Sequence, residues 1–149
     1  MTPQKPEQLI TCRNPDDQVI GVEINGKARA YPHRILNWHE VVNDKLGGEP
    51  ILISYCPLCD SNLVFDRNIN GEIREFGVSG ILYLSNVVMF DRQSSVSEES
   101  LWSQIEMRTI SGAEAPSETE LTLLPARVTK WNNWKSDHPR TTVLDVDTG

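Results

Sequence analysis

The chain has 149 residues, of which 38% are hydrophobic and 23% charged, a composition typical of a globular domain and not of a disordered chain. Its formal charge is −7 and no basic stripe is visible, which argues against a nucleic-acid partner. No apolar run approaches the roughly 20 residues that cross a bilayer, and the first residues lack the apolar stretch of a secretory signal. We therefore expect a soluble protein without a transmembrane segment, cytoplasmic if Met1 is the native start and extracytoplasmic if a leader was removed.

The first clear element is a β-hairpin. Two strand-like runs, residues 19–24 and 27–31, enclose the dipeptide Asn25-Gly26, which is a strong signal for a tight turn. A helix is predicted next, because apolar residues of HRILNWHEVVND recur with approximate helical spacing before Gly47-Gly48 ends the segment. The residues on this expected helical face are Ile35, Leu36, Trp38, Val41 and Val42.

The middle of the chain is typical of short antiparallel strands. β-rich runs alternate with turn signals such as Asn70-Gly71, and Gly77 and Gly80 predict bulges or bends. The expected strands cover residues 51–56, 62–67, 73–78, 80–92, 121–124 and 142–144.

A second short helix is expected near the end of the chain. Thr129 is the predicted N-cap, Trp131 and Trp134 share one helical face, and Pro139 prevents continuation. The predicted fold is α+β and β-rich, an antiparallel, partly closed sheet or barrel with one or two short flanking helices. We expect a polar lead-in over residues 1–16 and a single domain over residues 17–149.

Two of the three cysteines lie between expected strands, in ISYCPLCDSNLVFDR. Pro57 favours the second position of a β-turn that starts at Cys56 and ends at Cys59. Such a turn brings its end Cα atoms within about 7 Å, which permits two sulfurs on one metal ion or, with strain, a disulfide. Cys12 lies in the lead-in, where we expect a free thiol outside the site.

The first interpretation is a soft-metal site. The motif resembles the knuckles of rubredoxins and zinc ribbons, but the chain holds only one, so other ligand types must complete the site. His39 is the best third ligand because its segment leads through Gly-Gly into the cysteine strand, and the Met89 thioether is a further candidate. This donor set suits copper or zinc, and a position left open to water would make the protein a small metalloenzyme.

Two alternatives stay open. One is a metal-free thiol-disulfide oxidoreductase, although the strand-like DSNLVFDR offers the cysteines no helix N-terminus to lower their pKa. The other is a small-molecule binding module whose cysteines are structural. Its pocket candidates lie mostly at strand ends, where surface ion pairs are the simpler explanation of the charged residues. They are Asp66, Arg67, Asp91, Arg92, Trp102 and Gln104.

The chain resembles the bacterial and archaeal family catalogued as domain of unknown function 3179. The resemblance rests on GVEINGKARAYPHRILNWHEVVND, ISYCPLCDSNLVFDR, FGVSGILYLSNVVMFDRQ, SLWSQ and WNNWKSDHP, which follow one another in the family's order. It implies that His39, both turn cysteines and the six pocket candidates match positions of the family pattern, and that Cys12 lies outside it. Many members resemble exported or membrane-anchored proteins. The family usually has Gly-Thr after the second cysteine, where this chain has Asp60-Ser61.

Overall fold

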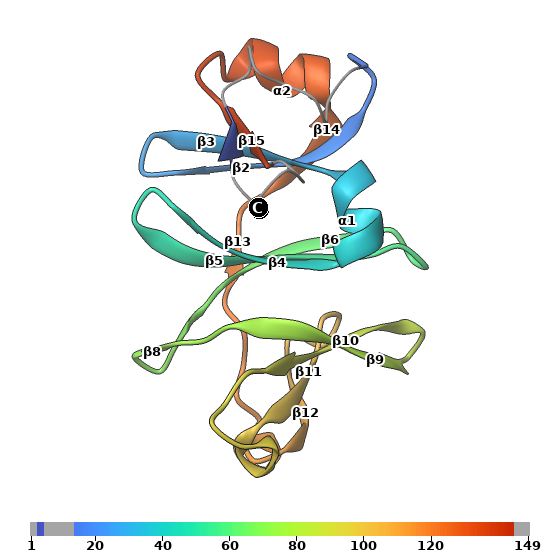
Figure 1. The fold of residues 1–149 in the computed structure, drawn as a ribbon, viewed down its shortest axis with the longest axis vertical. Coiled ribbons are helices and arrows are strands. Elements are labelled where there is room, and N and C mark those ends of the chain that lie inside the picture. The colour runs from blue at the N-terminus through green and yellow to red at the C-terminus, as the bar shows by residue number, and fades with distance from the viewer. Residues whose placement is uncertain (1–2, 5–13, 145–149) are drawn as a thin grey trace. The chain divides into compact units, whose positions relative to one another are not determined.

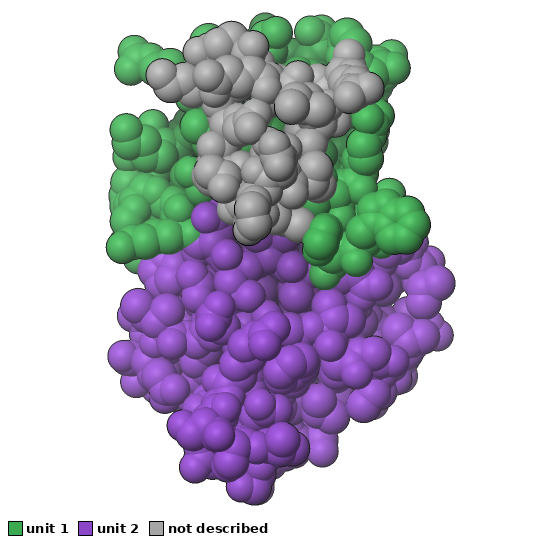
Figure 2. Space-filling model, in the orientation of Figure 1, with its two compact units in different colours: residues 1–39, 45–49, 125–149 green, residues 40–44, 50–124 purple. Residues whose placement is uncertain are grey.

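A computed structural model describes residues 3–4 and 14–144, and the chain divides into two compact units (Figure 1). Unit 1 comprises residues 1–39, 45–49 and 125–149, and unit 2 comprises residues 40–44 and 50–124 (Figure 2). In sequence, unit 2 thus consists of two segments that interrupt unit 1. Whether residues 17–149 behave as one domain stays a prediction, and Cys12 lies outside the described residues.

Unit 1 is built on a five-stranded sheet in the order β1-β15-β3-β2-β14. The predicted hairpin is confirmed, because β2 and β3 pair antiparallel around Asn25 and Gly26, whose φ angles of 52° and 78° match a two-residue hairpin turn. All pairs in this sheet are antiparallel except β15 with β3, which is parallel. The strands are β1 (Pro3–Gln4), β2 (Gln18–Ile24), β3 (Lys27–Pro32), β14 (Arg127–Lys130) and β15 (Thr142–Leu144).

Helix α1 (His33–His39) is shorter than the sequence predicts. The expectation that Val41 and Val42 extend it was wrong, since both lie in β4 (Val41–Leu46). Glu40 has φ 61°, a left-handed conformation that ends the helix, and β-branched residues fit a strand better than a helical turn.

Helix α2 (Trp131–Asp137) covers the sheet of unit 1 (Figure 1). Its N-cap is Lys130 and not the predicted Thr129, which lies in strand β14. Trp131 and Trp134, which were predicted to share one helical face, are both buried, in a cluster with Val19, Ala30 and Val143.

The indole of Trp134 leaves no room for a side chain at Gly21. A Cβ atom built on Gly21 would lie 2.3 Å from Trp134 Cε3, far inside van der Waals contact. The glycine in β2 is therefore required for α2 to pack this closely on the sheet.

Unit 2 contains two four-stranded sheets, in the orders β13-β6-β5-β4 and β12-β11-β10-β9, and the small ribbon β7-β8. Residues 45–49, at the turn between β4 and β5, count with unit 1. The remaining strands are β5 (Glu49–Cys56), β6 (Ser61–Asp66), β7 (Asn68–Ile69), β8 (Glu72–Ile73), β9 (Phe76–Tyr83), β10 (Asn86–Asp91), β11 (Ser100–Ser103), β12 (Arg108–Gly112) and β13 (Leu123–Leu124).

Both large sheets of unit 2 contribute to one core. Leu52 and Phe65 come from β5 and β6, while Phe76, Met89 and Trp102 come from β9, β10 and β11. Phe76 and Trp102 meet edge to face with ring centroids 5.5 Å apart. The β-rich α+β prediction is confirmed, with several separate sheets in place of one.

The bulge predicted near Gly80 is confirmed. Val78 pairs with Met89 and Leu82 with Val87, so β9 carries two more residues than β10 between these pairs, and Gly80 has φ 80°. Ser79 Oγ donates a hydrogen bond to Val88 O across the bulge at 2.6 Å. This irregularity shapes the β9–β10 hairpin, whose far strand begins with Asn86.

Helices α1 and α2 have seven residues each, and within the described ranges no helix has the length and apolarity of a membrane span.

Candidate functional site

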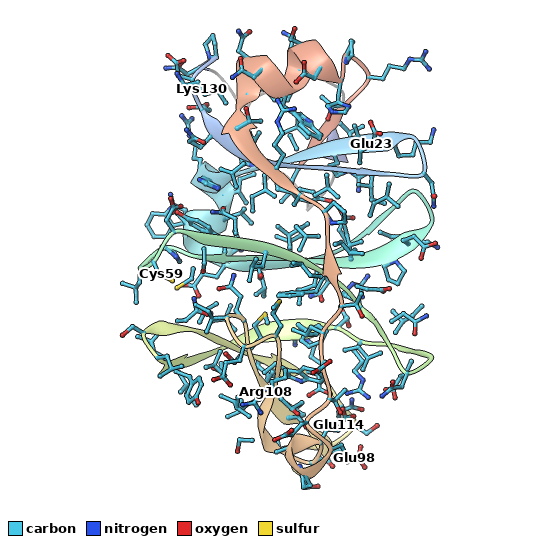
Figure 3. The ribbon with its side chains drawn as sticks, turned by 180° about the vertical axis from the view of Figure 1, so that it is seen from behind. Glu23, Cys59, Glu98, Arg108, Glu114 and Lys130 are labelled. Atoms are coloured by element: carbon cyan, nitrogen blue, oxygen red, sulfur yellow. The ribbon has the colours of Figure 1, made fainter. Side chains whose placement is uncertain are left out.

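The two turn cysteines lie at the end of the β5–β6 hairpin in unit 2. Cys56 is the last residue of β5 and pairs with Ser61, the first residue of β6, so residues 57–60 form the loop, with Asp60 in the left-handed region at φ 51°. Both cysteines are free thiols, but Cys56 is buried and Cys59, which is labelled in Figure 3, is exposed. One hairpin therefore holds two sulfurs in different environments.

The exposed sulfur lies beside a network of polar side chains from three strands and a following turn. Asn86 Nδ2 donates to Cys59 Sγ at 2.9 Å and to Ser61 Oγ at 3.0 Å, and Cys59 Sγ and Ser61 Oγ are 3.4 Å apart. Ser61 Oγ donates to Gln104 Oε1 at 2.6 Å, and Gln104 Nε2 donates to Ser54 Oγ at 3.0 Å. Gln104 and Ser54 are fully buried, so the network fixes the polar side of the turn.

Burial and hydrogen bonding together separate the acidities of the two thiols. The hydrogen bond with Ser61 does most to lower the pKa of Cys59, and bonds from the Cys56 and Asn86 side chains add to it, while desolvation, the second-largest effect, opposes them. Burial raises the pKa of Cys56, as does the hydrogen bond that its thiol gives to Cys59. The exposed sulfur is thus the better thiolate, and the buried one keeps its proton.

Asn86 has an unused acceptor. It is 1% exposed, and its Oδ1 atom is buried with no hydrogen-bond partner among the described residues. The opposite amide orientation would place this oxygen against the sulfur and remove both donated bonds. The observed orientation therefore favours the ionised form of Cys59.

The predicted metal ligands come from different parts of the fold. His39 ends α1 in unit 1, Cys56 and Cys59 lie in unit 2, and Met89 is fully buried in the core of unit 2. Across residues 3–4 and 14–144, no group of three or more His, Cys, Asp or Glu side chains is suited to one metal ion. Binding of copper or zinc by Cys56, Cys59 and His39, with or without Met89, stays a prediction.

Among the pocket candidates, Gln104 alone joins the cysteine network. Trp102 and Asp91 are buried together, because Trp102 Nε1 donates to Asp91 Oδ1 at 3.0 Å. Arg67 is also buried, and its guanidinium donates to the carbonyl oxygens of Ile51, Arg74 and Asp44.

The other two candidates lie at strand ends, as predicted. Asp66 Oδ1 accepts the backbone N–H of Asn68 at 2.8 Å, and the exposed Arg92 lies over the ring of Phe90. These contacts stabilise turns and the ends of strands and leave only Gln104 next to the thiols.

The sequence predictions missed Ser61 and Asn86 as parts of the site. Ser61 lies in the quoted motif two residues after Cys59, and Asn86 begins NVVMFDR, which echoes the NLVFDR that follows the cysteines. That echo is the signal that links the two strands. Only the tertiary structure brings the first residue of β10 to the loop between β5 and β6.

The family described as "Protein of unknown function (DUF3179)" has a model that matches residues 5–149. The chain belongs to this family. No curated protein and no solved structure was found to match it. The match spans essentially the whole sequence, so the cysteine turn, Asn86 and Gln104 all lie within the family region.

Proposed function

We propose that the protein is a thiol-disulfide oxidoreductase in which Cys59 attacks and Cys56 resolves. The observation that carries this proposal is the asymmetry of the two cysteines. Cys59 is exposed, its sulfur accepts hydrogen bonds from Asn86 and the Cys56 thiol, and its pKa is lowered. Cys56 is buried and its pKa is raised. Attack requires a thiolate that solvent can reach, and resolution requires a second thiol nearby. The attacking cysteine is therefore the second of the pair in sequence, the reverse of a motif whose first cysteine is the nucleophile.

The reaction balances as an exchange of two electrons. The Cys59 thiolate attacks one sulfur of a substrate disulfide, forming a mixed disulfide and releasing the other half of the substrate as a thiolate. Cys56 then loses its proton to solvent and attacks Cys59 Sγ, which releases the second half. The protein ends with a Cys56–Cys59 disulfide and the substrate ends as two thiols. The reverse sequence oxidises a dithiol substrate, and the redox poise of the compartment decides the direction.

A trapping experiment tests the assignment in a Cys12→Ser background, which removes the third thiol. With 2-hydroxyethyl disulfide as substrate, Cys56→Ser protein should accumulate a mixed disulfide at Cys59, detected by mass spectrometry. Cys59→Ser protein should form no adduct at a comparable rate, and protein with both cysteines should form an internal disulfide. An adduct chiefly on Cys56, or no internal disulfide, would contradict the proposal.

The soft-metal alternative uses the same sulfurs. Its support is the pair of neighbouring thiols, while the donors around Cys59 compete with a metal ion for sulfur lone pairs. Elemental analysis of protein purified without a histidine tag separates the two functions. About one equivalent of copper or zinc, lost in both Cys→Ser variants, would favour metal binding. Thiol exchange that is unchanged by a chelator would favour the oxidoreductase.

A further inference from the structure

Unit 2, which carries Cys56 and Cys59, is more acidic than the chain as a whole. Residues 40–44 and 50–124 contain thirteen acidic residues, four arginines and no lysine, a formal charge of −9. The rest of the chain has ten basic and eight acidic residues, a formal charge of +2. The chain's net charge of −7 therefore hides a strong difference between its two units.

Two of the four arginines of unit 2 are buried, since Arg67 and Arg74 are only 9% and 7% exposed. Arg74 pairs with Asp91 at 3.3 Å and Glu114 at 2.5 Å, so these opposite charges largely cancel inside the unit. The formal charge of −9 makes the potential around unit 2 negative, which attracts cations and repels anions.

The local surroundings of Cys59 have the same sign and an apolar rim. Asp60, the next residue, is exposed and is the one charged side chain in the segment from Cys56 to Ser61. Leu58, on the other side of Cys59, is 71% exposed. Tyr83 pairs directly opposite Asn86, so their side chains lie on the same face of the β9–β10 ribbon.

The turn that joins β9 to β10 adds further apolar surface. Leu84 is 68% exposed and Leu82 is about half exposed. Because Asn86 contacts Cys59 Sγ, this hairpin end lies in the neighbourhood of the reactive sulfur.

We infer that the disulfide that reacts with Cys59 belongs to a cationic, partly apolar polypeptide, and that anionic disulfides such as oxidised glutathione are poor substrates. This inference rests on the proposed function and specifies its substrate class. The charge of unit 2 selects the sign of the partner, while Leu58 and the β9–β10 turn supply apolar contacts near the sulfur. Asp60 is the local specificity residue, because its carboxylate is the charge nearest to Cys59 along the chain.

The test compares three small disulfides that differ in charge: cystamine (cationic), 2-hydroxyethyl disulfide (neutral) and dithiodiglycolate (anionic). Single-turnover rates are measured with the Cys12→Ser protein and divided by the rates of a free monothiol with the same reagents, which removes their intrinsic reactivity. In water, a unit charge about 7 Å from a charged reagent changes the rate of its reaction with Cys59 about threefold, and the net charge of unit 2 adds to this effect. We expect cystamine to be favoured over dithiodiglycolate by about tenfold or more at low ionic strength.

Two controls show whether charge causes the preference among the reagents: the salt concentration and one matched pair of variants. At about 1 M salt, where the Debye length is about 3 Å, the three normalised rates should converge. Asp60→Asn keeps a side chain that tolerates the left-handed conformation and should lower the cystamine rate about threefold relative to the neutral reagent. Glu98→Gln removes the same charge at the far end of unit 2 (Figure 3) and should lower it much less.

Peptides extend the test to the polypeptide itself. A disulfide-linked peptide flanked by Lys and Leu should react faster than the same peptide with Glu in place of Lys, and faster than one with Ser in place of Leu. Equal normalised rates, or a preference for the anionic reagents, would overturn the inference, and the neutral reagent would still report the proposed function. Failure of Cys59 to react with any of the reagents would instead overturn the proposed function.

Discussion

The side-chain nitrogen of Asn86 lies 2.9 Å from Cys59 Sγ and 3.0 Å from Ser61 Oγ, so a single amide group donates to both polar atoms at the open side of the cysteine turn. Ser61 has only one proton to donate and two acceptors near it, Gln104 Oε1 at 2.6 Å and Cys59 Sγ at 3.4 Å. Rotation of this hydroxyl towards sulfur would accompany ionisation of Cys59. The hydroxyl beside the thiol is thus itself held by buried Gln104.

Ser61→Ala should raise the pKa of Cys59, because it removes the hydrogen bond that lowers this pKa most. In the Cys12→Ser background, the alkylation rate of Cys59 by iodoacetamide follows the thiolate fraction, so its midpoint should move to higher pH. Ser97→Ala, which alters an exposed serine elsewhere in unit 2, is the matched control and should leave the midpoint unchanged. An unmoved midpoint in Ser61→Ala protein would show that Ser61 does not tune the thiol.

Asn86→Asp should slow the alkylation of Cys59 at neutral pH. The substitution keeps the shape of the side chain but replaces the donor beside Cys59 Sγ with an acceptor that carries negative charge when ionised, which disfavours the thiolate. The control is Asn132→Asp, an exposed position in α2, which should alkylate like the parent protein. A rate equal to or above that of the parent at Cys59 would contradict the assigned role of the amide.

Gln104→Leu should lower the free energy of unfolding by about 1–3 kcal/mol. The leucine has similar size but leaves the hydroxyl of Ser61 and the buried Ser54 without their amide partner. Urea unfolding followed by tryptophan fluorescence measures the loss, and Gln18→Leu at an exposed position of β2 is the control. Unchanged stability would mean that solvent replaces the amide, and that the network is less rigid than its burial implies.

Asp91 should make unit 2 sensitive to acid. Burial by itself would raise the pKa of this carboxyl, but hydrogen bonds from Gln93, Trp102 and the Ser100 backbone N–H hold it below the ordinary value. Because the folded pKa lies below the unfolded one, the stability that Asp91 contributes is fully present above the unfolded value of about 3.9 and is lost as pH falls through the folded value.

The matching variant is Asp91→Asn. It should lower the free energy of unfolding by about 3 kcal/mol at neutral pH, because Arg74 loses a buried partner. It should also flatten the dependence of this free energy on pH in the acid range. Denaturant midpoints at pH 6 and pH 3 measure both effects. A parent protein whose stability does not fall in acid would contradict the role given to Asp91.

Gly21→Ala should destabilise unit 1 by about 1–3 kcal/mol, because a methyl group would overlap the indole of Trp134. The expected loss is measured by thermal or urea unfolding. Gly26→Asn is the comparison, since this turn position has open space around it and a φ of 78° that asparagine tolerates. Equal losses in the two variants would indicate that α2 moves away from the sheet to accept the methyl group.

Local signals in the sequence predicted the parts of the fold that local chemistry decides. Asn25-Gly26 permits the left-handed angles of the first hairpin turn, and Pro57 lies in the loop that joins β5 to β6. The failure at Val41 and Val42 has a local cause too, because Glu40 adopts a conformation that its residue type rarely takes. Thr129 was a plausible cap, but its pairing with Val19 placed it in a strand.

The site was less predictable because its atoms come together through long-range pairing. Gln104 donates to Ser54, which lies 50 residues earlier, and Asn86 reaches Cys59 across 27 residues. No periodic pattern in the sequence indicates that β5, β6 and β10 come together at this turn. The sequence identified the sulfurs, and only the tertiary structure identifies the groups that distinguish one from the other.

The split arrangement of unit 1 has a consequence for biosynthesis. Arg29 Nε donates to Thr142 Oγ1 at 2.9 Å, across 113 residues of chain, so the sheet of unit 1 can be completed only after Thr142 has been synthesised. Unit 2 does not depend on that late segment, because all of its strands are synthesised before Thr142. Domains tend to fold as units during translation. We therefore expect the dithiol to be assembled on the nascent chain while the amino-terminal strands still lack their carboxy-terminal partners.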